Sequence, residues 1–168
     1  RNKVVRRRRP FPPLACGPPF TALGCRPAFR SDGEQPALNY ISTRGEAPPL
    51  AFEDVVLAGL ARDGGLYVPQ AWPVLAPETI ASFAGMPFAD VAVEVLYPFT
   101  GAAIPREELR RMTGAAYARF GHPAVTPLVQ VGANRWVLEL FHGPTLAFKD
   151  VAMQLLARLM EAVLIERG

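Results

Sequence analysis

The spacing of apolar and polar residues along the chain changes character near residue 38. Before that position, apolar residues follow neither the helical nor the strand period, and frequent prolines interrupt any helix. After it, short apolar stretches alternate with polar segments and with Gly or Pro breaks. The pattern divides the chain into a leader, residues 1–37, which we expect to be disordered, and a body, residues 38–168, which we expect to fold.

Within the body, acidic first turns and prolines at first helical positions indicate helices, and short β-rich runs indicate strands. A turn at residues 132–134 separates the last two of these runs, which predicts a hairpin. The predicted helices span residues 52–61, 77–83, 88–97 and 105–120, and the predicted strands span residues 40–43, 66–68, 126–130 and 135–141.

A long final helix is expected after Thr145, whose hydroxyl is of the type that caps helices. Its polar residues Gln154, Arg158 and Glu161 form one stripe, and most of the remaining surface is apolar. Such a helix is typical of the interior of a larger body. We therefore expect the sequence to be truncated at its C-terminal side.

Charge is concentrated in the leader. Its eight basic and two acidic residues give it a net charge of +6, so the total of +3 leaves the body at −3. An Arg cluster of this kind can bind nucleic acid phosphates, or it can belong to a transit peptide. The chain begins with arginine, and we favour a third interpretation, in which the leader is not native sequence.

The two cysteines, Cys16 and Cys25, also lie in the leader, and their spacing matches no zinc motif. His122 and His142 are far apart in sequence, so we expect no metal site. The apolar runs fall short of the ~18 residues that a membrane span needs. We expect a cytoplasmic protein with no membrane partner.

Lys149 is the candidate for covalent chemistry. It follows three apolar residues, 146–148, at the start of the final helix. Partial desolvation would lower the pKa of such an amine and make it a nucleophile that forms Schiff bases with aldehydes. The alternative is a common surface lysine, with its stem along the core and its head in water. Spacing alone does not separate the two.

The run ELFHGPTLAFKD, residues 139–150, resembles the lysine motif of the threonine synthase family. These are pyridoxal-phosphate enzymes of the tryptophan-synthase-β structural type, also called fold type II. The runs YISTRG at residues 40–45 and DGGLYVP at residues 63–69 resemble the N-terminal region of the same family. The resemblance covers residues 38–168 and leaves the leader outside.

The resemblance implies an α/β fold with two parts. Residues 38–120 would form a helical N-terminal domain, and residues 121–168 would begin the pyridoxal-phosphate-dependent domain. Lys149 would be both the catalytic and the cofactor-binding residue, with no metal. His142 would orient substrate or be a loop residue bonded to backbone.

The implied reaction converts O-phosphohomoserine and water to threonine and phosphate, with Lys149 as the base. In the family, the loop that holds the cofactor phosphate lies after the lysine, and no such loop occurs in this sequence. We therefore expect this chain alone to be inactive. Two alternatives stay open: a threonine-synthase-like phospho-lyase that releases a 2-keto acid, and a non-catalytic module.

Overall fold

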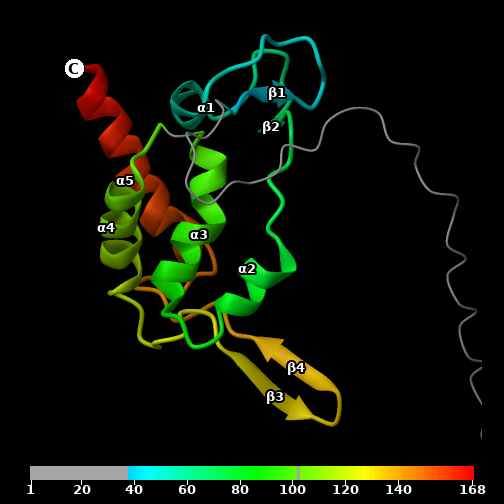
Figure 1. The fold of residues 1–168 in the computed structure, drawn as a ribbon, viewed down its shortest axis with the longest axis vertical. Helices are drawn as coiled ribbons and strands as arrows, with labels where there is room; N and C mark the ends of the chain where they lie inside the picture. Colours follow the sequence, from blue (N-terminus) through cyan, green and yellow to red (C-terminus); the bar gives the residue numbers. More distant parts are fainter. Residues whose placement is uncertain (1–37, 102) are drawn as a thin grey trace, which may run out of the picture.

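Three helices pack side by side at the centre of the structure: α3 (Phe88–Thr100), α4 (Arg106–Tyr117) and α5 (Asp150–Arg167), with α4 contacting both others (Figure 1). The computed structural model describes residues 38–101 and 103–168. The expectations for the leader, including its two cysteines, lie outside the described residues. Two small sheets flank the helices, so the expected mixture of helices and strands is confirmed.

The first sheet pairs β1 (Tyr40–Ser42) with β2 (Tyr67–Pro69) in antiparallel register, with Ile41 opposite Val68. The short helix α1 (Phe52–Ala58) lies between them in the sequence. Gly64 in the connecting turn has φ +77°, a conformation that glycine adopts without strain. Both strands predicted in this region are confirmed, each shifted by a single residue at its end.

A single carboxylate, that of Asp63, holds the β1–β2 sheet to its loops. Its Oδ1 accepts hydrogen bonds from the Ser42 hydroxyl and the Gly65 N–H, both at 2.8 Å. Its Oδ2 accepts the backbone N–H groups of Glu46 and Ala47 at 3.1 and 3.0 Å. Burial alone would raise the pKa of Asp63, but these hydrogen bonds outweigh it and hold the pKa below its ordinary value.

The second sheet is the predicted hairpin, and it is confirmed. Strand β3 (Leu128–Gly132) pairs antiparallel with β4 (Arg135–Leu138), with an irregular register between Gln130 and Gly132. Asn134 occupies the turn at φ 54°, a conformation that asparagine tolerates. The second strand ends at Leu138, three residues before the predicted end, because the chain turns away there towards α5.

The predicted ends of α1 and α3 were wrong by three residues each, and that of α4 by the same number. Helix α1 stops at Ala58 because Gly59 takes φ +68° and closes the last turn with an N–H bond to Val55. Helix α3 passes through Pro98, which was expected to end it, and stops at Thr100. Pro98 lies in the last turn, where its missing N–H removes one helical bond, and the left-handed Gly101 ends the helix instead.

The other predicted helices are also present. Helix α2 covers Pro77–Ser82, one residue short of the predicted end. Helix α4 begins directly after Pro105 and ends at Tyr117, three residues early. The long final helix is also confirmed, although it begins at Asp150 rather than directly after Thr145.

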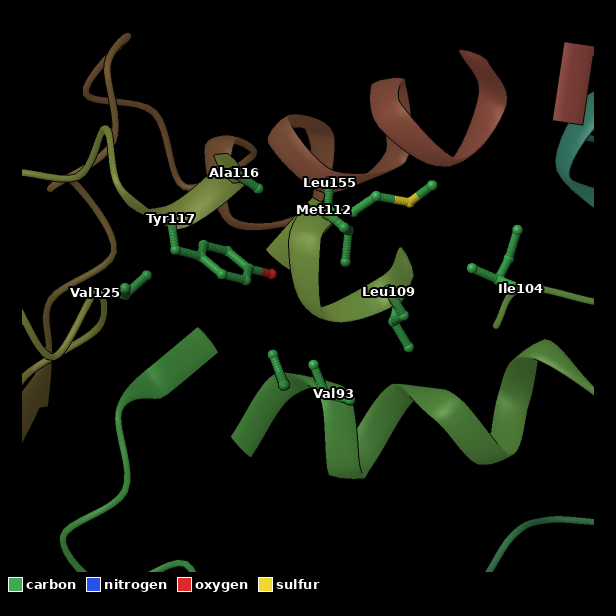
Figure 2. Close-up of a cluster of buried hydrophobic side chains, with 9 residues drawn as sticks. Val93, Ile104, Leu109, Met112, Ala116, Tyr117, Val125 and Leu155 are labelled. Atoms are coloured by element: carbon green, nitrogen blue, oxygen red, sulfur yellow. The ribbon is translucent and has the colours of Figure 1, made fainter. Parts of the chain in front are cut away.

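The core lies on both sides of α4. Leu109, Met112 and Ala116 of α4 lie between Val93 of α3 and Leu155 of α5 (Figure 2). The cluster therefore joins residues from both sides of the boundary expected at residue 120. Helix α5 buries Leu155 and leaves apolar side chains such as Met153, Leu164 and Ile165 exposed, as its pattern indicated.

Among the described residues, no helix has the combined length and apolar character that crossing a bilayer requires.

Replacing Leu109 with Ala should lower the free energy of unfolding by about 2–5 kcal/mol, because it leaves a cavity in a fully buried site. Leu109 has 0 % of its surface exposed, whereas Leu60 is 64 % exposed. Leu60→Ala is the matched control and should change the free energy by less than about 0.5 kcal/mol. Urea unfolding of both variants checks this, and equal losses would contradict the assigned core.

Asp63→Asn should lower the urea midpoint at neutral pH. In either orientation, the NH₂ group of the asparagine would face at least one backbone N–H, that of Gly65 or those of Glu46 and Ala47, which would lose its acceptor. A carboxyl with a lowered folded-state pKa stabilises the fold fully above its unfolded pKa, about 3.9, and loses this effect as the pH falls through the folded value. The difference between wild type and variant should therefore shrink as the pH falls below about 4. Midpoints that differ by a constant amount at every pH would contradict this role.

Candidate active site

Lys149 is the last residue of the connection between β4 and α5. It occupies the N-cap position of α5, in a right-handed helical conformation with φ −63° and ψ −23°. Its side chain is exposed to solvent. In residues 38–101 and 103–168, its ammonium takes part in none of the hydrogen bonds or ion pairs. The structure therefore presents this amine at the surface, free of partners.

The desolvation expected for Lys149 is not found. The apolar residues before it do not cover the amine, because they point outwards themselves: Leu146 is 73 % and Phe148 64 % exposed. The sequence shows that these neighbours are apolar, but it does not show their direction.

His142 makes two polar contacts, one through its backbone and one through its ring. Its backbone carbonyl accepts the N–H of Gly121 at 2.8 Å, and its Nε2 lies 2.7 Å from Oε2 of Glu139. The tertiary fold also brings the ring of His122 within 5.3 Å of the His142 ring, which their separation in sequence did not indicate. Of the two expectations for His142, the structure favours a loop residue, with its carbonyl rather than its ring bonded to backbone.

The Asp150 carboxylate closes the connection onto the first turn of α5. Its Oδ2 accepts the backbone N–H of Thr145 at 2.8 Å and the Thr145 hydroxyl at 2.9 Å. Its Oδ1 accepts the amide of Gln154 at 3.4 Å. The predicted role of Thr145 as helix cap was wrong: it donates to the helix's first side chain instead of accepting from the helix backbone.

The environment of Asp150 keeps it charged. The residue is only 4 % exposed. Burial would by itself raise the pKa of this carboxyl, but the hydrogen bonds from Thr145 and Gln154 stabilise the charged form and hold the pKa below its ordinary value. A buried, charged and hydrogen-bonded side chain thus directly follows the exposed amine.

Helix α5 is itself anchored to α4. The Tyr117 hydroxyl donates to the carbonyl of Val151 at 3.2 Å, and burial raises the pKa of Tyr117. Arg158 donates to the carbonyl of Ala115 in α4 at 3.2 Å. The expected polar stripe therefore contains a residue that joins two helices, which the periodicity of α5 alone did not show.

The arrangement can support nucleophilic or proton-transfer chemistry by one amine on a held backbone. In the described part of the chain, no group of three or more His, Cys, Asp or Glu side chains is placed to hold a metal ion. The contribution of Asp150 was missed at the sequence level. The signal was present in the spacing of Gly143, Thr145 and Asp150, but it needed the fold to be interpreted.

Comparison with known proteins identifies the relatives of this chain. A family model described as the threonine synthase N terminus matches residues 39–117. The threonine synthase of Pseudomonas aeruginosa is 54 % identical over 131 residues, which cover 78 % of this chain and 28 % of that protein. The chain thus spans a little over a quarter of the length of this relative.

Solved structures agree with the sequence relatives. A crystal structure of threonine synthase from Brucella melitensis with bound pyridoxal phosphate has a TM-score of 0.76 and 60 % identity, covering 79 % of this chain and 28 % of that one. The yeast threonine synthase has a TM-score of 0.69 and 37 % identity, covering 77 % and 27 %. The resemblance inferred from the motifs is confirmed: the chain is similar in both sequence and fold to the N-terminal portion of threonine synthases.

Proposed function

We propose that this chain serves in threonine synthase activity, the pyridoxal-phosphate-dependent conversion of O-phosphohomoserine and water to L-threonine and phosphate. The observation that carries the proposal is Lys149. Its amine is exposed and unpartnered within the described residues, and it ends the run that resembles the family's lysine motif. The 60 % identity to a pyridoxal-phosphate-bound threonine synthase supports the same cofactor here.

We also propose the division of the body into an N-terminal domain, residues 38–120, and the start of a fold type II catalytic domain, residues 121–168. The family-model match over residues 39–117 supports the first part. The position of Lys149 between the β3–β4 hairpin and α5 supports the second. A cytoplasmic location stays a prediction.

Of the groups that would hold pyridoxal phosphate, the described structure offers one, the Lys149 amine, which can react with the cofactor's aldehyde. Schiff-base formation needs a primary amine that is accessible and able to lose its proton, and Lys149 has no carboxylate partner in the described structure that would hold its charge. When bound, the cofactor supplies an electron sink for charge that develops at the substrate carbon atoms.

Lys149 would act twice in this reaction. It would first bind the cofactor covalently. Once substrate has displaced it, its amine would move protons at the substrate Cα and Cβ, while phosphate leaves from Cγ and water adds at Cβ.

Borohydride reduction of the chain with pyridoxal phosphate should fix the cofactor on Lys149 only weakly and below stoichiometric amounts, because the family's loop for the cofactor phosphate does not occur in this sequence. The test is sharp because the chain contains only two lysines, Lys3 and Lys149. Peptide mass spectrometry should find the reduced adduct on Lys149 in wild type and in Lys3→Arg, and should find none there in Lys149→Arg. An adduct confined to Lys3 or to the N-terminal amine would refute the cofactor assignment.

A chimera tests the activity itself. Residues 38–168 would replace the matching portion of the Pseudomonas aeruginosa threonine synthase, which is 54 % identical. We expect threonine formation, and we expect Lys149→Ala to reduce kcat by at least about 10²–10⁴-fold, the range typical of general base catalysis. Glu166→Gln, at an exposed position near the end of α5, is the control and should keep the rate. A correctly folded but inactive chimera would favour the non-catalytic alternative.

A further inference from the structure

The Asp150 carboxylate has no task in the proposed reaction, yet it is the most completely enclosed charged group next to Lys149. It is 4 % exposed and accepts three hydrogen bonds, two of them from Thr145. A charge is kept in such a place only where its hydrogen bonds compensate the loss of water. Asp150 therefore joins Thr145, within the connection, to the start of α5.

Gly143 completes this arrangement by leaving room for it. A Cβ atom on Gly143 would lie 2.3 Å from the Asp150 Cβ and 2.4 Å from its Oδ2, distances that no side chain tolerates. Gly143, Thr145 and Asp150 thus form one interlocked unit, which we call the Asp150 latch. The close contact requires glycine at position 143, and the two hydrogen bonds require a hydroxyl at position 145 and a side-chain acceptor at position 150.

The latch holds a strained backbone. Leu146 has φ 59°, in the left-handed region that bulky side chains disfavour, and its N–H donates to the Gly143 carbonyl at 3.0 Å. Its side chain is largely exposed, so packing does not explain the conformation. Strain of this kind persists where the surrounding structure imposes it, and it clusters at functional sites.

Lys149 lies inside the closed segment that the latch creates. The hydrogen bonds between Thr145 and Asp150 close a loop of the chain that contains Lys149. On its C-terminal side, its carbonyl accepts the N–H groups of Ala152 and Met153 at 3.1 and 2.8 Å. The backbone of Lys149 is therefore held from both directions, whereas its amine makes no hydrogen bond or ion pair within residues 38–101 and 103–168.

We propose that Asp150 is a positioning residue for Lys149: through Thr145 and Gly143, it fixes the backbone from which the reactive amine extends. The inference rests on the proposed function of Lys149, and it adds a role for the residue beside it. Asp150 itself does not touch the reacting atoms. Its effect is geometric, since both oxygens of the carboxylate are occupied by donors from this chain.

The competing explanation is electrostatic. An acidic residue in the first turn of a helix stabilises it through the helix dipole, whatever its hydrogen bonds. Asp150→Asn separates the two explanations. The Asn carbonyl can accept both donors of Thr145, and its NH₂ can face Gln154, whose amide can turn to accept it. The variant removes the charge and keeps the latch, whereas Asp150→Ala removes both.

The test is NMR relaxation of the whole chain labelled with ¹⁵N-lysine, in which only Lys3 and Lys149 contribute backbone signals. Lys3→Arg assigns the Lys149 peak. We expect an order parameter near about 0.85, that of rigid backbone, for Lys149 in wild type, Asp150→Asn and Thr145→Ser. We expect it to fall below about 0.6 in Asp150→Ala, and to an intermediate value in Thr145→Val, which keeps one of the two bonds.

Asp54→Asn is the matched control. It removes a carboxylate that pairs with Arg167 at the far end of α5, at 2.7 Å, and should leave the Lys149 signal unchanged. Far-ultraviolet circular dichroism verifies that each variant is folded. If Asp150→Ala is unfolded, Thr145→Val takes its place in the test.

Unchanged order in Asp150→Ala or, where that variant is unfolded, in Thr145→Val would overturn the inference. Disorder in Asp150→Asn equal to that of Asp150→Ala would also overturn it. Because no cofactor is used, a failure of cofactor binding at Lys149 would refute the proposed function and leave this result intact.

Discussion

The burial of both faces of α4 is the constraint on which the rest of the structure depends. Leu109 and Met112 exclude water between α3 and α5, and the Tyr117 ring packs edge-to-face on Phe88 at 4.9 Å while its hydroxyl holds the start of α5. Burial of this kind supplies most of the stability of a small fold. Because α5 is placed against α4 by these contacts, the position of Lys149 at its N-cap follows from the core.

Two aspartates perform the same structural task at the two motifs that carry the family resemblance. Asp63 collects four donors around the β1–β2 loops, and Asp150 collects three around the lysine connection. Each lies near a glycine that leaves no room for a Cβ atom: at Gly65 this atom would lie 2.3 Å from the Ser42 hydroxyl, and at Gly143 it would lie 2.3 Å from the Asp150 Cβ. Close packing around the two carboxylates thus explains these two glycines.

The apolar residues before Lys149 predicted a desolvated amine, but the structure shows an exposed one. A buried lysine is reactive because desolvation disfavours its charge. Lys149 is instead exposed, on a backbone that is held from both sides, and the carboxylate beside it is committed to Thr145. To the proposed Schiff-base chemistry, this part of the chain would contribute an accessible amine, without an ion pair in the described residues, on a fixed backbone.

The sequence by itself determined the hairpin, the existence of every helix and the identity of the candidate lysine, because these depend on local patterns: a turn between β-rich runs, acids in a first turn, and a motif of consecutive residues. Only the tertiary structure decided where α1 and α3 end, since the backbone conformations at Gly59 and Gly101 place these ends away from the predicted residues 61 and 97. It also decided the exposure of Lys149, the approach of His122 to His142 and the enclosure of Asp150. These features depend on which segments meet in space and in which direction side chains point, and no local pattern contains that information.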